Sequence, residues 1–185
     1  MNIAVTGATG HIGVNLCRML AAEGHAIRAL CRASVAGLEG LDMEIIAGEV
    51  LDEAALDRLV AGAEVVFHLA ALISVTGDRD GRVMKINVEG PRKVAAACLR
   101  AGVRRLVHFS SVHAYAQVGP DQVLDESCPL AGERAFAYDR SKAAGQREIL
   151  RAVEQGLDAV ILNPTGVIGP NDFPGPLMGQ TFLRL

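Results

Sequence analysis

The sequence predicts an α/β fold, a doubly wound parallel sheet with helices on both faces, from three observations. Half of the 185 residues are hydrophobic and only 4% are aromatic, as expected of small and aliphatic residues in helices that cover a parallel sheet. Short β-type runs alternate with helical stretches, which implies right-handed crossovers between parallel strands. Three glycines, Gly7, Gly10 and Gly13, directly follow the first apolar run.

The elements can be placed in order along the chain. Gly24 and Gly102 each follow a helical stretch, where helix C-terminal caps favour glycine. The predicted strands are residues 2–6, 26–31, 43–47, 64–69, 104–109 and 158–163, and the predicted helices are residues 11–23, 53–61, 85–101 and 137–155.

The pattern changes after the last predicted strand, because prolines and glycines there disfavour regular structure. We therefore interpret residues 1–163 as one domain and residues 164–185 as a crossing segment that leaves the sheet. The residues that mark this change are Pro164, Gly166, Gly169, Pro170, Pro174, Gly175, Pro176 and Gly179.

The glycines open a turn suited to binding phosphate. Residues 3–5 form the strand, the glycines let the backbone turn sharply, and the next helix directs its unsatisfied N–H groups at a ligand. The spacing is Gly-x-x-Gly-x-x-Gly, whereas the common dinucleotide fingerprint is Gly-x-Gly-x-x-Gly. The place of the glycines between a strand and a helix is the same in both. The alternative is a tight turn with close strand-to-helix packing and no ligand.

Charge and hydropathy exclude several classes of protein. The net charge is −3 without a basic run, which argues against nucleic-acid binding. No leader precedes the first strand, and no apolar stretch approaches the roughly 20 residues that span a bilayer, so we expect a cytoplasmic protein with no membrane contact. The cysteines follow no metal-binding spacing, so we expect free thiols and no metal; they are Cys17, Cys31, Cys98 and Cys128.

Tyr138 and Lys142 are four residues apart in a helical stretch, so their side chains project from one face. A phenol has a pKa of about 10, and an adjacent ammonium lowers it, which makes Tyr138 a candidate general acid or base. Ser110 and Ser111 end the strand at 104–109, at the sheet edge where such folds place ligands. A hydroxyl there can bind a substrate carbonyl, or it can cap a turn.

Taken together, the glycine turn, Ser111 and the Tyr138-x-x-x-Lys142 pair resemble the short-chain dehydrogenase/reductase superfamily, in particular its extended branch. That branch contains nucleotide-sugar epimerases and dehydratases and dihydroflavonol-reductase-like enzymes. Weaker marks are His68-Leu69-Ala70-Ala71, Asn87-Val88-Glu89-Gly90 and residues 163–170. The resemblance implies a Rossmann fold for residues 1–163, an NAD(P)-dependent oxidoreductase and a homodimer. It also implies that a substrate-binding lobe follows and that this chain is truncated.

The resemblance also assigns roles to residues. Tyr138 gives a proton to the substrate oxygen or takes one from it. Lys142 lowers the pKa of the Tyr138 phenol and holds the nicotinamide ribose, and Ser111 orients the reacting oxygen. We expect Asn87 to be mainly structural, and Glu49 stands where relatives often carry aspartate. The full set expected near the cofactor is Gly7, Thr9, Gly10, His11, Ile12, Gly13, Arg32, Glu49, Val50, Leu69, Ala70, Ala71, Asn87, Ser110, Tyr138, Lys142, Asn163, Pro164, Thr165 and Val167.

The second strand favours NADP, with NAD as the alternative. NAD sites usually carry a carboxylate at the end of this strand, whereas a 2′-phosphate needs a cation. Here the strand is followed by Arg32. We expect a reductase acting on a small-molecule carbonyl or hydroxyl; the alternatives are a nucleotide-sugar epimerase or dehydratase and a non-catalytic dinucleotide-sensing regulator.

Overall fold

Six short strands form one sheet in the computed structural model, which describes residues 1–32, 34–35, 37–119 and 121–173. Every neighbouring pair is parallel, and the order is β3-β2-β1-β4-β5-β6. The doubly wound arrangement predicted from the sequence is confirmed, and the strand order reverses between β1 and β4. The strands are β1 (Asn2–Thr6), β2 (Ala26–Cys31), β3 (Glu44–Ala47), β4 (Val65–His68), β5 (Arg105–Phe109) and β6 (Ala159–Leu162).

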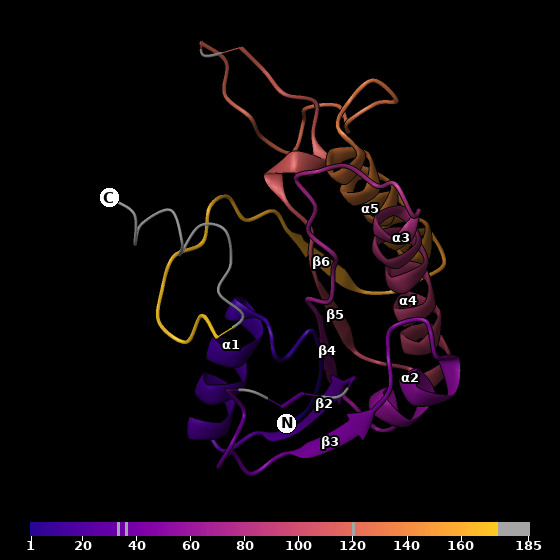
Figure 1. Ribbon diagram of the computed structural model, residues 1–185. Helices are drawn as coiled ribbons and strands as arrows, with labels where there is room; N and C mark the ends of the chain where they lie inside the picture. Colours follow the sequence, from indigo (N-terminus) through magenta and orange to yellow (C-terminus); the bar gives the residue numbers. More distant parts are fainter. Residues whose placement is uncertain (33, 36, 120, 174–185) are drawn as a thin grey trace.

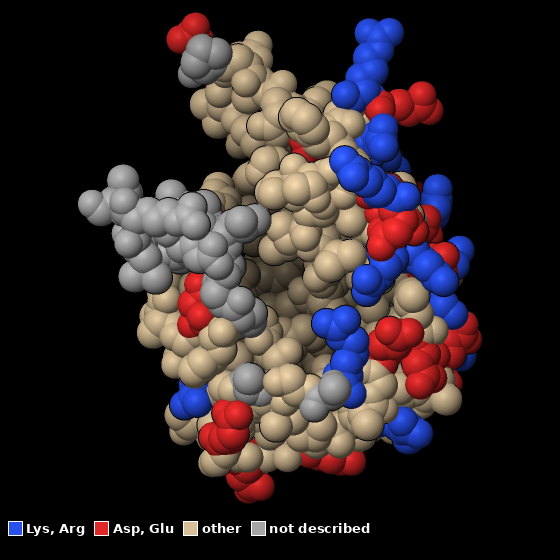
Figure 2. All heavy atoms as spheres, in the orientation of Figure 1, with Lys and Arg blue, Asp and Glu red and all other residues tan. Residues whose placement is uncertain are grey.

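Helices cover both faces of this sheet. Helix α1 (His11–Ala22) lies on one face, and α2 (Glu53–Val60), α4 (Gly90–Ala101) and α5 (Ala137–Glu154) lie on the other (Figure 1). Lys and Arg side chains are mixed with Asp and Glu over the side that carries α2, α4 and α5 (Figure 2). Open α/β sheets bind ligands outside the carboxyl ends of the strands at the point where the strand order reverses, which in this sheet is between β1 and β4.

The core has two parts because successive side chains of a strand point to opposite faces. Ile3 and Val5 pack with Val14 and Cys17 of α1 on one side. Ala4 packs with residues of α2, α4 and α5 on the other side, among them Leu56, Leu59, Val94 and Ile149. The four cysteines are free thiols, as expected, and burial raises the pKa of Cys17 and Cys98 to about 12.

The predicted single helix at 85–101 is wrong in one respect. The structure has a short α3 (Arg82–Met84), a π-helical turn η1 (Lys85–Glu89) and then α4. Pro91 has no N–H to donate to the carbonyl of Asn87 four residues earlier. That carbonyl instead approaches α5 so closely that a Cβ on Gly145 would lie 2.1 Å from it. Glycine at 145 therefore lets the π-turn dock against α5.

The described part of the segment after β6 runs toward α1. The carbonyl of Pro170 lies 3.1 Å from His11 Nε2 and accepts a hydrogen bond of 2.9 Å from Asn15 Nδ2. Residues 174–185 of the predicted crossing segment lie outside the described residues. Within the part of the chain that the structure describes, no helix is long and apolar enough to cross a membrane.

Candidate active site

The glycine turn joins β1 to α1, and packing accounts for two of its three glycines. Gly7 has φ +72°, and a Cβ there would lie 2.6 Å from the backbone nitrogen of Ala70. A Cβ on Gly13 would lie 2.1 Å from the carbonyl oxygen of Gly7. Close packing, the alternative weighed from the sequence, therefore requires glycine at both positions.

Gly10 is different, since a Cβ there would meet only the Gly7 oxygen, at 3.3 Å. It is the N-cap of α1 and supplies no side-chain hydrogen bond to the first turn of the helix. The N–H groups of that turn, with the positive end of the helix dipole, suit an anion such as a pyrophosphate. Thr9, His11 and Ile12, also predicted here, are partly buried around this end of α1.

The end of β4 is fastened to the glycine turn by Thr6, a residue that the sequence analysis did not single out. Its carbonyl accepts from Leu69 N at 3.1 Å, and its hydroxyl accepts from Ala70 N at 3.3 Å. The same hydroxyl lies 2.7 Å from Nδ1 of His68. The fully buried Thr6 thus fixes Leu69 and Ala70 beside the turn, and Ala71 is exposed next to them.

Two buried histidines lie behind this edge of the sheet. The rings of His68 and His108, on the adjacent strands β4 and β5, stack with centroids 5.2 Å apart. Burial lowers the pKa of His68 to about 3, with a smaller effect of the Lys142 charge, and burial holds the pKa of His108 well below its usual value. Both rings are therefore neutral at neutral pH.

This pair should make the fold sensitive to acid. An unfolded histidine has a pKa of about 6.5, so between about pH 6.5 and 3 the unfolded chain binds more protons than the folded one. Stability is complete above that window and falls as the pH decreases through it, by ~1 kcal/mol per histidine for each pH unit. Urea unfolding at about pH 7 and about pH 5 measures this loss.

The matched variants separate the buried pair from other histidines. His108→Phe should lose less stability on acidification than the wild type, whereas His25→Gln, outside the core, should lose as much. Equal free energies of unfolding at the two pH values in the wild type would contradict the assignment.

Tyr138, Lys142 and Ser111 come together at the carboxyl edge of the sheet. Lys142 is buried, and its Nζ donates to the carbonyl oxygen of Phe109 at 3.0 Å. Ser111 is the N-cap of the 3-10 turn η2 (Val112–Ala114), its hydroxyl accepts from His113 N at 3.2 Å, and its presence near the Tyr138 phenol lowers the pKa of that phenol. The structure therefore groups the three predicted catalytic residues: Ser111 follows β5, and Tyr138 and Lys142 lie in the first turns of α5.

The sequence analysis predicted that Lys142 lowers the pKa of Tyr138, but in this structure the pKa of Tyr138 is raised. Burial raises the pKa of Tyr138 and the Asp139 charge raises it further, while the hydrogen bond with Ser111 acts in the opposite direction. Burial also lowers the pKa of Lys142 to about 8, and its ammonium is directed at the backbone of β5. The structure thus keeps Tyr138 a protonated phenol at neutral pH.

A polar network missed by the sequence analysis fixes the neighbouring backbone. The Ser110 hydroxyl donates to Gln146 Oε1 at 2.7 Å, and Gln146 Nε2 donates to the Tyr115 hydroxyl at 3.2 Å. Asn163 Nδ2 reaches the same hydroxyl at 3.5 Å, and its Oδ1 is buried with no partner among the described residues. Ser110 therefore faces the protein interior, and the Asn163 side-chain oxygen is a buried acceptor at the end of β6.

Asn87 makes hydrogen bonds to two other parts of the chain. Its Oδ1 accepts from Leu72 N at 2.8 Å, and its Nδ2 donates to Leu72 O and to Ser141 Oγ, each at 2.9 Å. Both N–H groups are used, so Asn87 ties the loop after β4 to helix α5.

The remaining predicted residues lie around the crevice in different settings. Val50 is buried in the core and packs beside Gly90, so its side chain serves the fold. Arg32 and Glu49 are exposed after β2 and β3. Pro164 accepts a hydrogen bond from Val112 N at 3.2 Å, while Thr165 and Val167 are exposed after β6.

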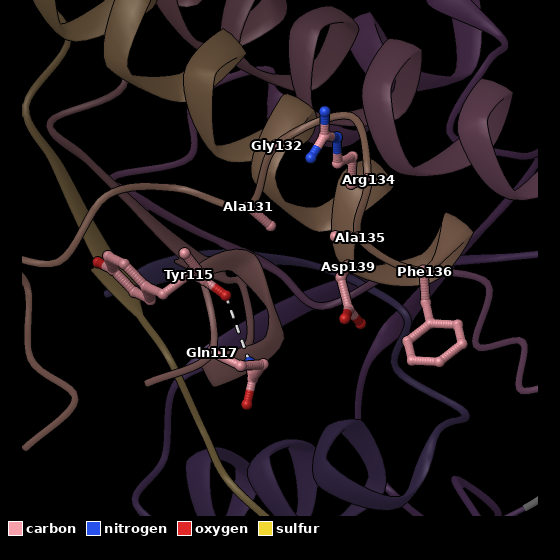
Figure 3. A pocket seen from close by; sticks show the side chains of 9 residues that line it. Tyr115, Gln117, Ala131, Gly132, Arg134, Ala135, Phe136 and Asp139 are labelled. Atoms are coloured by element: carbon pink, nitrogen blue, oxygen red, sulfur yellow. Dashed lines mark hydrogen bonds between the residues drawn. The ribbon is translucent and has the colours of Figure 1, made fainter. Parts of the chain in front are cut away.

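A pocket of about 430 Å³ opens between Tyr115 and the start of α5 (Figure 3). Its described lining is mostly apolar, with one cation and one carboxylate. Phe136 and Asp139 lie toward the right of the view, Tyr115 and Gln117 lie toward the left, and Arg134 lies above Asp139 (Figure 3). The lining residues are Tyr115, Ala116, Gln117, Ala131, Gly132, Arg134, Ala135, Phe136 and Asp139.

A Rossmann sheet with a glycine turn and a serine, tyrosine and lysine at one edge defines a class of dinucleotide-binding α/β domains. The model of the NAD dependent epimerase/dehydratase family matches residues 3–184. The chain therefore belongs to that family, which confirms the resemblance found from the sequence.

Three proteins show what the chain is similar to. Sterol demethylase protein B of Methylococcus capsulatus is 38% identical over 99% of this chain and 56% of its own length. The 4-hydroxy-2-methyl-3-oxo-4-farnesyl-3,4-dihydroquinoline-1-oxide ketoreductase of Stigmatella aurantiaca is 33% identical over 93% and 52%. A solved short-chain dehydrogenase/reductase superfamily protein from Agrobacterium tumefaciens, with bound NAD, is 29% identical over 88% and 48%, with a TM-score of 0.76. The chain thus spans about half the length of the curated relatives it matches.

Proposed function

We propose that this chain is the dinucleotide-binding part of an NAD(P)-dependent reductase that acts on a small-molecule carbonyl. The observation that carries the proposal is the placement of Tyr138, Ser111 and Lys142 together at the sheet edge beside the glycine turn. The similar Agrobacterium protein binds NAD, and the similar Stigmatella protein is a ketoreductase.

Each residue of the proposed site has its own role in binding or proton transfer. The N-terminus of α1 and the glycine turn bind the pyrophosphate, and Lys142, whose ammonium spends one of its three donors on Phe109, binds the nicotinamide ribose. Ser111 binds the carbonyl oxygen, and Tyr138 gives it a proton. The hydride is the chemistry that the nicotinamide dinucleotide supplies when bound.

Reduction is favoured over epimerisation by the state of the tyrosine and by the pocket. The Tyr138 phenol is protonated at neutral pH, since its ordinary pKa is about 10 and burial raises it further, so it can give a proton to a carbonyl. The pocket around Tyr115 carries three alanines and two aromatic rings, with Arg134 and Asp139 as its charged groups, which suits a mainly apolar substrate.

The two reactions differ in their redox balance, which gives the test. The full-length protein should consume NADPH in proportion to the alcohol formed from a panel of apolar ketones. An epimerase or dehydratase would convert a nucleotide sugar with no net change of the dinucleotide, and a sensing regulator would bind NADPH without turnover. Either of the last two results would contradict the proposed reductase.

We propose NADP rather than NAD as the cofactor because of Arg32. Its exposed side chain follows β2, where the adenosine ribose lies in Rossmann folds. NADPH should bind about tenfold more tightly than NADH, and Arg32→Ala should remove most of this difference, with the largest effect at low salt. Calorimetry with both dinucleotides measures this, with Arg79→Ala, in the exposed loop after β4, as the control. Equal affinities, or tighter binding of NADH, would show that Arg32 does not read a 2′-phosphate.

We also propose that the protein is a homodimer formed through α4 and α5. Leu150 and Val153 of α5 are 42% and 40% exposed, although both are apolar. Light scattering on a size-exclusion column should give twice the mass of the chain, and Leu150→Glu should shift it to the monomer. A monomeric wild type would contradict this arrangement.

A further inference from the structure

Residues 163–173 follow β6 and connect three parts of the molecule. The segment starts beside η2, where Val112 N donates to the Pro164 carbonyl at 3.2 Å. It then runs to α1, where the carbonyl of Pro170 is held (Figure 1). Its described end reaches the loop after β2, since a Cβ on Gly37 would lie 2.6 Å from the Phe173 ring. The segment therefore passes the proposed pyrophosphate site at α1 and ends near the proposed adenosine site after β2.

Asn15, one turn into α1, makes the central contact with this segment. Its Nδ2 donates to the Pro170 carbonyl at 2.9 Å and to the carbonyl of His11, four residues earlier in α1, at 2.8 Å. Its Oδ1 accepts from Asn171 Nδ2 at 2.9 Å. The Asn15 side chain thus uses both of its N–H groups and its oxygen, and two of the three bonds hold the segment.

Two further features lie at the same point. Nε2 of His11 lies 3.1 Å from the Pro170 carbonyl, so this carbonyl has two side chains of α1 as neighbours. Asn171 has φ +62°, a left-handed conformation that asparagine adopts more readily than most residues. The chain therefore bends where it is fastened to α1.

The part between the two fastened points is long enough to pass over a bound ligand. Six residues separate Pro164 from Pro170 and span up to about 20 Å when extended. Strands β1 and β6 are three strand spacings apart, which is about 14 Å. Within the described chain, residues 165–169 make no hydrogen bond. Residues 164–171 thus form a strap that is held at its ends and free in its middle.

We propose that Asn15 is a positioning residue for the dinucleotide: it fastens the strap across the nicotinamide and pyrophosphate parts of bound NADPH and slows the release of the cofactor. A ligand beneath a closed segment leaves only when that segment opens, so weaker fastening should raise the dissociation rate. This inference rests on the dinucleotide binding in the proposed function, and it is independent of the reaction that follows.

Removal of the fastening tests this role in the full-length protein. Asn15→Leu is similar in size and favours the helix, but it makes none of the three hydrogen bonds. NADPH should dissociate about tenfold faster from it, measured in a stopped-flow instrument as the fluorescence change on displacement by excess NADP⁺. Asn171→Gly accepts the same φ and loses one bond, so the rate should rise about two- to fivefold. Met19→Leu, at an exposed position one turn further along α1, is the control and should leave the rate unchanged.

A shorter ligand separates the strap from damage to α1. Adenosine 2′,5′-bisphosphate carries a phosphate for the glycine turn but no nicotinamide. Its affinity for Asn15→Leu, measured by calorimetry, should stay within about twofold of the wild type, because the helix end is intact. NADH and AMP replace the two ligands if the wild type prefers NADH.

Two results would overturn the proposal: an unchanged rate of dinucleotide release from Asn15→Leu, or equal losses of affinity for the long and the short ligand. A wild type that binds neither NADPH nor NADH would be a different failure, because it would defeat the proposed function and this inference with it. A protein that binds the dinucleotide without reducing a ketone would defeat only the proposed reductase.

Discussion

Tyr138→Phe should lower the turnover of the full-length protein by ~10²–10⁴-fold and leave its affinity for NADPH nearly unchanged. The substitution removes the proton donor, and general acid catalysis contributes a factor of that size. The ring and its edge contact with His113 remain, so the pocket should keep its shape. Steady-state kinetics and calorimetry measure the two quantities separately.

Lys142→Ala is the informative companion, because it should reduce both turnover and NADPH affinity. The removed ammonium is proposed to hold the ribose, and its loss also leaves the Phe109 carbonyl without its 3.0 Å donor. Tyr115→Phe serves as the control for tyrosine loss and should cost far less turnover than Tyr138→Phe. Near-normal turnover in Tyr138→Phe would defeat the proposed role of the tyrosine.

Gly13→Val should weaken NADPH binding by about 10- to 100-fold, the effect expected from an overpacking cost of ~1–3 kcal/mol. A Cβ at position 13 would lie 2.1 Å from the Gly7 carbonyl and 2.8 Å from Ala8 Cα, so α1 must move away from the turn. That movement displaces the N–H groups proposed to bind the pyrophosphate.

The control for Gly13→Val is Gly119→Ala, at a glycine with open space around it. It should leave NADPH affinity unchanged in the same calorimetric titration. If Gly13→Val bound NADPH as tightly as the wild type, the turn would not be the pyrophosphate site.

The sequence was sufficient to predict the sheet, because each strand is a short apolar run and each connection is long enough for a crossover helix. The observed strands lie within one residue of the predicted bounds. The π-turn at Lys85–Glu89 could not be predicted, because it depends on how closely the Asn87 carbonyl approaches Gly145 in α5. Nothing in the local pattern reports that distance.

Some residues of the candidate site could likewise be predicted from the sequence, and others could not. Tyr138, Lys142 and Ser111 could be found because their spacing and their place after a strand have a chemical meaning. Thr6, Gln146 and Asn15 could not be found, because their contacts are with partners 62, 36 and 155 residues away in the chain. The direction of the Tyr138 pKa was also mispredicted, since helical spacing shows that a lysine is near but does not show burial or the carboxylate of Asp139.

Binding of NADPH to the 185-residue chain tests the central claim most directly, because the glycine turn, Lys142 and Arg32 are all within it. Isothermal titration calorimetry of the wild-type chain should show saturable binding at one site per chain, with a clearly weaker signal for Gly13→Val under the same conditions. The chain spans about half of its curated relatives, so the affinity should be lower than that of the full-length protein. The absence of any saturable binding of either NADPH or NADH to a folded chain would contradict the account.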